Sequence, residues 1–274
     1  MKKALPEHVP MDQFKVIDNC LQVGHVAVDR LAERVGQTPF YAYDRQLMTD
    51  RVAALRGQFP EHIHLHYAIK STPMPAVVQH LAGLTDGLDV ASLKELRVAL
   101  DTGTSPRNIS FAGPGKSDTE LKAAAAAGII INLESAGEME RLATICNQTG
   151  HRANVAVRVN PDFELKTSGM KMAGGPKPFG IDAEQVPAVL KRLGQLDLAF
   201  QGFHIFSGSQ NLRPDAIIEA QTNTFALALK LADHAPSPVQ WLNIGGGFGI
   251  PYFPGEQRLD LGPVADNLAT LLAR

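Results

Sequence analysis

Cysteine is scarce in this chain: its 274 residues contain only Cys20 and Cys146, which are far apart in the sequence. Such a pair predicts neither a disulfide framework nor a cysteine metal site. Long apolar runs are also missing. No stretch of roughly 18 apolar residues occurs, so the sequence predicts no membrane span. The N-terminus carries Lys2 and Lys3 but continues with prolines and charges, so we expect no signal peptide.

An excess of positive charge is absent as well. Lysine and arginine number 26 against 28 aspartates and glutamates, which gives a formal net charge of −2. A chain without a basic stripe is not expected to bind nucleic acid. The hydrophobic fraction of 45% and the charged fraction of 20% are typical of a globular protein with a sizeable core. We therefore expect a cytoplasmic enzyme with one large domain, or with one domain plus a fragment.

Strand-like and helix-like segments alternate over most of the chain, which predicts an α/β fold with a parallel sheet. The strand candidates are residues 64–70, 88–91, 108–112, 129–133, 154–160, 200–206 and 240–244. The helix candidates are residues 75–81, 93–102, 118–127, 136–149, 183–193, 216–234 and 263–273. A closed barrel of eight strands needs one more strand than these. The sequence therefore predicts either seven of the eight strands of a barrel or an open sheet.

The N-terminal segment has a different pattern. Residues 14–17 and 21–23 are typical of a short hairpin, and residues 28–35 of a helix. A strand pair without a partner sheet is expected to belong to a second domain. We therefore assign residues 1–37 to a piece of a β-domain and residues 38–274 to the incomplete barrel.

Lys70 is the first candidate for chemistry. It ends a strand in which it shares one face with His66 and Ala68, opposite an apolar face that should pack against helices. Catalytic groups of α/β barrels lie at the carboxyl ends of the strands, so Lys70 is expected to point over the barrel mouth. An amine that is desolvated there can act as a nucleophile. A solvated lysine at a strand end is the alternative.

Two further charged residues are predicted to face inward. Arg158 alternates with the valines of strand 154–160, and a buried arginine must find a partner. That partner is either a structural ion pair across the barrel or an anionic ligand. Asp89 follows Leu88 on the second strand and is expected to pair with Arg158 or with Lys70. A capping or loop role is the alternative for Asp89.

Glycine and small polar residues follow the last two strands. His204 lies in the sixth strand, Ser207 begins a loop of small residues, and Gly245, Gly246 and Gly247 follow the seventh strand. Adjacent glycines let backbone amides approach an anion, and barrels often bind phosphate after their last strands. Together with the lysine and the arginine, these loops predict a phosphorylated aldehyde cofactor held as an imine. A satisfied core histidine and a flexible turn are the alternatives.

Six sequence blocks, in order, are similar to those of the barrel-type (fold type III) pyridoxal-phosphate decarboxylases, the ornithine/diaminopimelate decarboxylase family. The blocks are YAIK at 67–70, LDVAS at 88–92, RVNP at 158–161, FGI at 179–181, FHI with SGSQ at 203–210 and IGGGFG at 244–249. The resemblance covers the chain from about residue 21 to its end. The stretch 168–180 also resembles the subgroup that accompanies bacterial exosortase systems.

This resemblance implies an alanine-racemase-like (β/α)8 barrel and pyridoxal 5′-phosphate as the cofactor. The implied roles are a Schiff base at Lys70, stacking of His204 on the pyridine ring, phosphate binding by Ser207, Gly245, Gly246 and Gly247, and Asp89 and Arg158 along the ring. The implied reaction is decarboxylation of a diaminopimelate-like or other basic amino acid, in which the ring serves as an electron sink. The implied partners are a small amino-acid substrate and, for the full-length protein, a second subunit, with no nucleic acid, membrane or metal.

Some features of the family are missing or altered. Its glutamate that pairs with the pyridine nitrogen, and the cysteine–aspartate pair and tyrosine of its C-terminal β-domain, have no counterpart up to Arg274. Phe206 stands where the family usually has glycine. The chain therefore looks truncated at its C-terminus, and we expect little turnover from it alone. The alternatives are an amino-acid racemase on the same barrel, a non-catalytic cofactor-binding protein and an inactive fragment.

Overall fold

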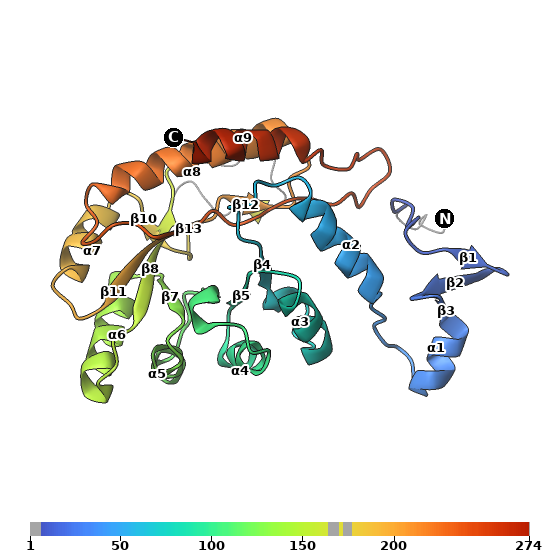
Figure 1. Ribbon diagram of the computed structural model, residues 1–274, viewed down its shortest axis with the longest axis horizontal. Helices are drawn as coiled ribbons and strands as arrows, with labels where there is room; N and C mark the ends of the chain where they lie inside the picture. Colours follow the sequence, from blue (N-terminus) through green and yellow to red (C-terminus); the bar gives the residue numbers. More distant parts are fainter. Residues whose placement is uncertain (1–6, 164–169, 172–176, 274) are drawn as a thin grey trace, which may run out of the picture.

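Eight parallel strands form the main sheet of this chain, seven of them in one continuous order, with helices packed along it (Figure 1). The computed structural model describes residues 7–163, 170–171 and 177–273. The hydrogen-bonded order is β13-β11-β8-β7-β6-β5-β4, with the short strand β10 pairing separately with β8. Every pair of neighbouring strands on this path is parallel, which confirms the predicted α/β architecture with seven strands.

The elements fall close to their predicted positions. The strands of the main sheet are β4 (His66–Ala68), β5 (Gly87–Val90), β6 (Ile109–Phe111), β7 (Ile130–Leu133), β8 (Asn154–Asn160), β10 (Ile181–Asp182), β11 (Ala199–Ile205) and β13 (Trp241–Asn243). The helices after residue 40 are α2 (Arg45–Arg56), α3 (Pro75–Ala82), α4 (Leu93–Asp101), α5 (Asp118–Ala127), α6 (Ala136–Thr149), α7 (Val186–Leu193), α8 (Pro214–Ala232) and α9 (Gly262–Leu272). Short 3-10 turns span Ile69–Ser71 and Pro106–Asn108, and β9 (Met170–Lys171) pairs with β12 (Gly208–Ser209).

The core lies between the sheet and its helices. On β8, Val155, Val157 and Val159 are buried and belong to this core, as their alternation with polar residues predicted. Leu121 of α5 and Leu142 of α6 are also fully buried in it. Side chains on the opposite face of the strands therefore have to be accommodated on the concave side of the sheet, where the predicted site residues lie.

The N-terminal segment forms a small sheet of its own. The predicted hairpin is present as β1 (Val16–Ile17) and β2 (Cys20–Val23), and a third strand, β3 (Val26–Ala27), pairs with β2. The predicted helix follows as α1 (Val28–Val35). In Figure 1 this unit lies at the right-hand end of the molecule, apart from the main sheet.

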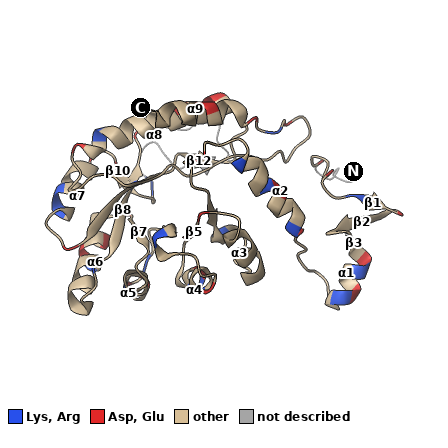
Figure 2. Cartoon of the chain, in the orientation of Figure 1, with Lys and Arg blue, Asp and Glu red and all other residues tan. Residues whose placement is uncertain are grey.

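Helix α2 was absent from the sequence prediction. Its start is fixed by Asp44, whose side chain accepts hydrogen bonds from the amides of Gln46 (2.9 Å) and Leu47 (3.4 Å). None of its residues is fully buried, but Met48, Val52 and Leu55 form a half-buried apolar stripe at helical spacing, a signal that the sequence analysis missed. Charged residues of both signs are scattered over the helices without forming one basic stripe (Figure 2). No helix within the described residues is long and apolar enough to cross a bilayer.

Candidate active site

The predicted site residues lie at one edge of the sheet. Lys70 follows β4, Ser207 follows β11 and Gly245 lies in the loop after β13. Because all strands of the main sheet are parallel, their carboxyl ends lie at the same edge. Three segments that are far apart in the sequence are thereby brought to one end of the incomplete barrel.

Lys70 lies in a 3-10 turn rather than in the strand itself. The turn is held by the Ser71 hydroxyl, which donates to the carbonyl of Ala68 (2.9 Å), and by the Tyr67 hydroxyl, which donates to the carbonyl of Thr72 (3.1 Å). The side chain of Lys70 is exposed. The expectation of a desolvated amine is therefore wrong for the described chain, because β4 is the terminal strand of the sheet and its outer side is uncovered.

Asp89 does not pair with Arg158 or Lys70 as predicted. On β5 its carboxylate accepts hydrogen bonds from Nδ1 of His66 (3.1 Å) and from the hydroxyl of Ser110 (2.8 Å). Burial acts to raise the pKa of Asp89, but its hydrogen bonds and the His66 imidazole outweigh that effect, and the pKa lies below its usual value. The correction follows from strand register, which places Asp89 beside Ala68 and Ser110 rather than beside a distant strand.

A hydrogen-bonded ladder extends this contact across four strands. The side-chain amide of Asn132 on β7 donates to the hydroxyl of Ser110 on β6 (3.3 Å), which in turn donates to Asp89. The ladder ends at His66 on β4. Because parallel strands in register place inward-facing residues side by side, four polar residues hydrogen-bond to neighbours, although Oδ1 of Asn132 has no partner among the described residues.

Arg158 is buried and forms an ion pair with Glu134, at 2.8 Å. Glu134 directly follows β7, the strand next to β8, so the pair links neighbours and does not cross the barrel as one prediction proposed. The guanidinium also lies 5.0 Å from the centre of the Phe179 ring, which is the geometry of a cation–π contact. The sequence analysis missed Glu134. The rule that selected Lys70, a polar residue at a strand end, would have found it if applied to residues 129–133.

His204 lies on β11 directly beside Arg158 in the strand register. Burial and the positive charges of Arg158 and Lys70 lower the pKa of His204 from 6.5 to about 4, against the opposing influence of Asp89 and Glu134. The imidazole is therefore neutral at pH 7. Buried Nδ1 of His204 has no hydrogen-bond partner among the described residues.

The two glycine-bearing loops contact each other closely. Gly245 and Gly247 have positive φ angles of 69° and 82°, which glycine adopts without strain. A Cβ at Gly247 would lie 2.2 Å from the carbonyl oxygen of Gly208, and one at Gly245 would lie 2.3 Å from the ring of Phe206. Any larger residue at these two positions would separate the loops.

Phe206 therefore occupies the space that the missing side chain of Gly245 leaves free. Both residues line a cavity of about 30 Å³ together with Ser207, Gly208 and Gly246. Such a space holds about two water molecules, which is the scale of a small anion. The phenylalanine that departs from the family pattern is thus accommodated by the glycine loop and forms part of the cradle wall.

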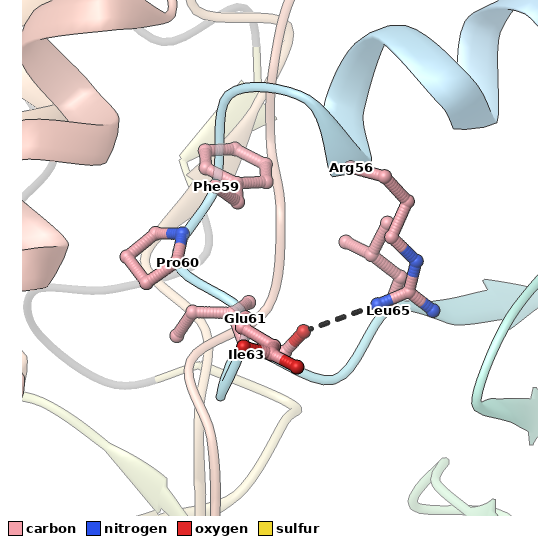
Figure 3. Close-up of a pocket in the computed structure, with 6 residues that line it drawn as sticks. All are labelled: Arg56, Phe59, Pro60, Glu61, Ile63 and Leu65. Carbon is pink, nitrogen blue, oxygen red and sulfur yellow. Dashed lines mark hydrogen bonds between the residues drawn. The ribbon is translucent and has the colours of Figure 1, made fainter.

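A larger cavity lies elsewhere. It measures about 190 Å³ and is lined by Arg56, Phe59, Pro60, Glu61, Ile63 and Leu65 (Figure 3). Leu65 precedes β4, whereas Lys70 follows it, so this cavity lies at the other end of the strand. None of the predicted site residues lines it, although one lining residue, Phe59, packs against Phe248 with ring centres 5.6 Å apart. Most of the stretch 168–180, which suggested the exosortase-associated subgroup, falls outside the described residues.

The comparisons with known proteins agree with this site. Residues 45–274 match the family described as pyridoxal-dependent decarboxylase, pyridoxal binding domain. The chain is 34% identical to L-glutamyl-(BtrI acyl-carrier protein) decarboxylase of Niallia circulans over 85% of this chain and 55% of that protein. It is 33% identical to diaminopimelate decarboxylase of Aquifex aeolicus over 98% of this chain and 62% of that protein.

The fold is shared with solved structures. The crystal structure of AQ1208 from Aquifex aeolicus superposes with a TM-score of 0.81 at 31% identity, covering 95% of this chain and 62% of that one. The seven strands are thus part of the alanine-racemase-like barrel that was expected. The chain spans a little over half of the length of the relatives that it matches. With the family match over most of its residues, it belongs to the pyridoxal-dependent decarboxylases, and it carries their pyridoxal-binding domain.

Proposed function

We propose that this chain is the cofactor-binding portion of an enzyme that decarboxylates an amino acid with pyridoxal 5′-phosphate. The observation that carries the proposal is the convergence of Lys70, His204 and the glycine loops at one edge of the sheet, in a chain of this family. Each of these elements supplies a different requirement: an amine to attach an aldehyde, a flat ring, and backbone amides for a phosphate.

The residues present fit the cofactor. The loop of Gly245 to Gly247 approaches Gly208 so closely that a Cβ would fill the gap, and the buried Ser207 lines the same cavity. His204 is half-buried and its Nδ1 has no partner within the described part of the chain. A phosphate group fits the glycine cradle, and a flat ring fits against the face of the imidazole.

Each residue then has a definite task. Lys70 attaches the cofactor through its amine, and Ser207 with the amides of residues 245–247 holds the phosphate. His204, which is neutral, packs against the ring without adding charge, while Arg158 and Asp89 line its side. When bound, the cofactor supplies an electron sink for the negative charge that remains at Cα after carboxylate loss. The chain's own contribution is to orient the bond that breaks.

We propose an amino acid of the diaminopimelate type, or another basic amino acid, as the substrate. Support comes from relatives named as diaminopimelate decarboxylases at 32% to 33% identity. The relative from Niallia circulans is named for a glutamyl group on a carrier protein. Carbon dioxide release from meso-diaminopimelate, lysine, ornithine and glutamate by the full-length protein would rank these substrates. Release from none of them would refute the proposed reaction.

Attachment of the cofactor tests the role of Lys70. We expect borohydride reduction in the presence of pyridoxal phosphate to label the peptide that contains Lys70, as detected by mass spectrometry. The Lys70→Ala variant should lose this label. The matched control Lys122→Ala, which removes an exposed lysine of α5, should keep it in full. A stoichiometric label that persists in Lys70→Ala would show that another amine holds the cofactor.

Finer assignments follow from the family resemblance. We propose that residues 1–37 belong to a β-domain, that the full-length enzyme is a cytoplasmic homodimer, and that it belongs to the exosortase-associated subgroup. The separate three-stranded sheet of β1, β2 and β3 supports the first of these. Sedimentation analysis of the full-length protein tests the second, and a monomer at micromolar concentration would contradict it.

A further inference from the structure

Glu134 is the most heavily engaged carboxylate near the candidate site. Its side chain is 1% exposed, and it accepts hydrogen bonds from the amide of Gly113 (2.5 Å), from the guanidinium of Arg158 (2.8 Å) and from the amide of Gly180 (2.9 Å). Three donors satisfy a buried carboxylate far better than water could in that space. Such an arrangement is fixed in geometry because every donor is itself anchored in the backbone or in a buried side chain.

The three donors come from three separate segments. Gly113 follows β6, Arg158 lies on β8, and Gly180 directly precedes β10. Gly180 has a φ of 79°, and a Cβ there would lie 3.0 Å from the carbonyl oxygen of Arg158. The turn before β10 is therefore held tightly against β8, and Glu134 is the side chain that joins both to the end of β7.

The same contacts fix the Arg158 guanidinium from two sides. Glu134 binds it at 2.8 Å, and the ring of Phe179 lies 5.0 Å from its central carbon. Arg158 is also the neighbour of His204 in the strand register. Glu134 therefore determines where the positive charge of Arg158 lies at the wall of the candidate site.

We propose that Glu134 is a positioning residue of the cofactor site, which acts by holding Arg158 and the Phe179–Gly180 turn in place. This inference rests on the proposed function, because it concerns affinity for pyridoxal phosphate. Glutamine at position 134 would keep the size of the side chain but lose the charge. It would also turn an amide N–H₂ towards one of the three donors, so that at least one contact would be lost.

The chain offers a matched control in the same buried region. Glu138 lies four residues further along the chain, in the first turn of α6. Its Oε1 accepts hydrogen bonds from Nζ of Lys116 (2.8 Å) and from the amide of Glu134 (3.1 Å). Its carboxylate is 2% exposed, close to the value for Glu134. Glu138→Gln keeps an oxygen acceptor for both donors and leaves the ion pair with Arg158 intact.

The experiment compares Glu134→Gln with Glu138→Gln by fluorescence titration with pyridoxal phosphate and by thermal melting without it. Loss of a hydrogen bond to a charged group predicts an affinity about 10-fold or more lower for Glu134→Gln. Glu138→Gln should change affinity by less than about 2-fold, even if both variants melt at lower temperature. Amide exchange of residues 177–181 should become faster in Glu134→Gln alone.

A third variant covers the case in which Glu134→Gln does not fold. Phe179→Leu removes the ring side of the same contact without altering any buried charge, and should lower affinity by about 2- to 5-fold at an unchanged melting temperature. Equal affinity losses in the Glu134 and Glu138 variants, or unchanged affinity in the Glu134 and Phe179 variants, would overturn the inference. Failure of the unaltered protein to bind the cofactor would instead refute the proposed function.

Discussion

Replacing His204 with glutamine removes an imidazole that the fold keeps neutral, and the pH dependence of stability should reveal it. Burial and the charges of Arg158 and Lys70 lower the pKa of His204 from 6.5 to about 4, although Asp89 and Glu134 act in the opposite direction. At about 1.4 kcal/mol per pH unit, that change corresponds to at most ~3.5 kcal/mol against the charged form.

The sign follows from proton binding in the two states. Between pH 6.5 and about 4, the unfolded chain carries a proton on His204 and the folded chain does not. Protonation of His204 therefore has no effect on the free energy of unfolding above pH 6.5. Below that pH the free energy of unfolding decreases, because the unfolded chain binds a proton that the folded chain does not. One proton of difference gives a slope of at most ~1.4 kcal/mol per pH unit.

Urea unfolding at several pH values between 4.5 and 7.5 measures this slope. We expect the free energy of unfolding of the unaltered protein to fall faster with decreasing pH than that of His204→Gln, by about 1 kcal/mol per pH unit between pH 6 and 4.5. Subtracting the two curves cancels the other titrating groups. Parallel curves would show that His204 has an ordinary pKa and that the charges of Arg158 and Lys70 do not reach it.

Two further substitutions test the loops and the buried charges. Gly247→Ala should lower stability by about 1–3 kcal/mol and weaken cofactor binding, because its φ is 82° and its Cβ would lie 2.2 Å from a backbone oxygen. Gly246→Ala, whose Cβ meets no protein atom, should leave stability nearly unchanged, and equal losses of stability in the two variants would contradict the close contact at Gly247. Lys116→Met should lower the free energy of unfolding by about 3–5 kcal/mol, because it leaves the Glu138 carboxylate buried without its cation. Adding Glu138→Gln to that variant should recover part of the loss in urea denaturation, and no recovery would argue against an ion pair.

Several elements were predictable because local pattern decides them. The helices α5 (118–127) and α6 (136–149) have their predicted bounds. Ser117 and Ser135 cap them by accepting hydrogen bonds from backbone amides three residues on. The glycine loop was also predictable from local sequence. Gly247 adopts a backbone conformation that other residues avoid, so the turn requires glycine, which the sequence shows directly.

The errors concern contacts between segments that are distant in the sequence. Asp89 was assigned to Arg158 or Lys70, but its partners are His66 and Ser110. Alternation tells which face of a strand a side chain occupies, whereas register between strands decides which side chain lies beside it. No property of the sequence around residue 89 specifies that register.

Periodicity along the chain was thus enough to establish parallel strands, their number, the inward face of β8 and the residue types at the strand ends. Folding alone brought Glu134 to Arg158 and Gly180, and left Lys70 exposed in the turn after the terminal strand β4. The physical reason is the range of the interactions. Alternation and capping act within a few residues, while ion pairs, burial and pKa values depend on which segments the sheet places next to one another.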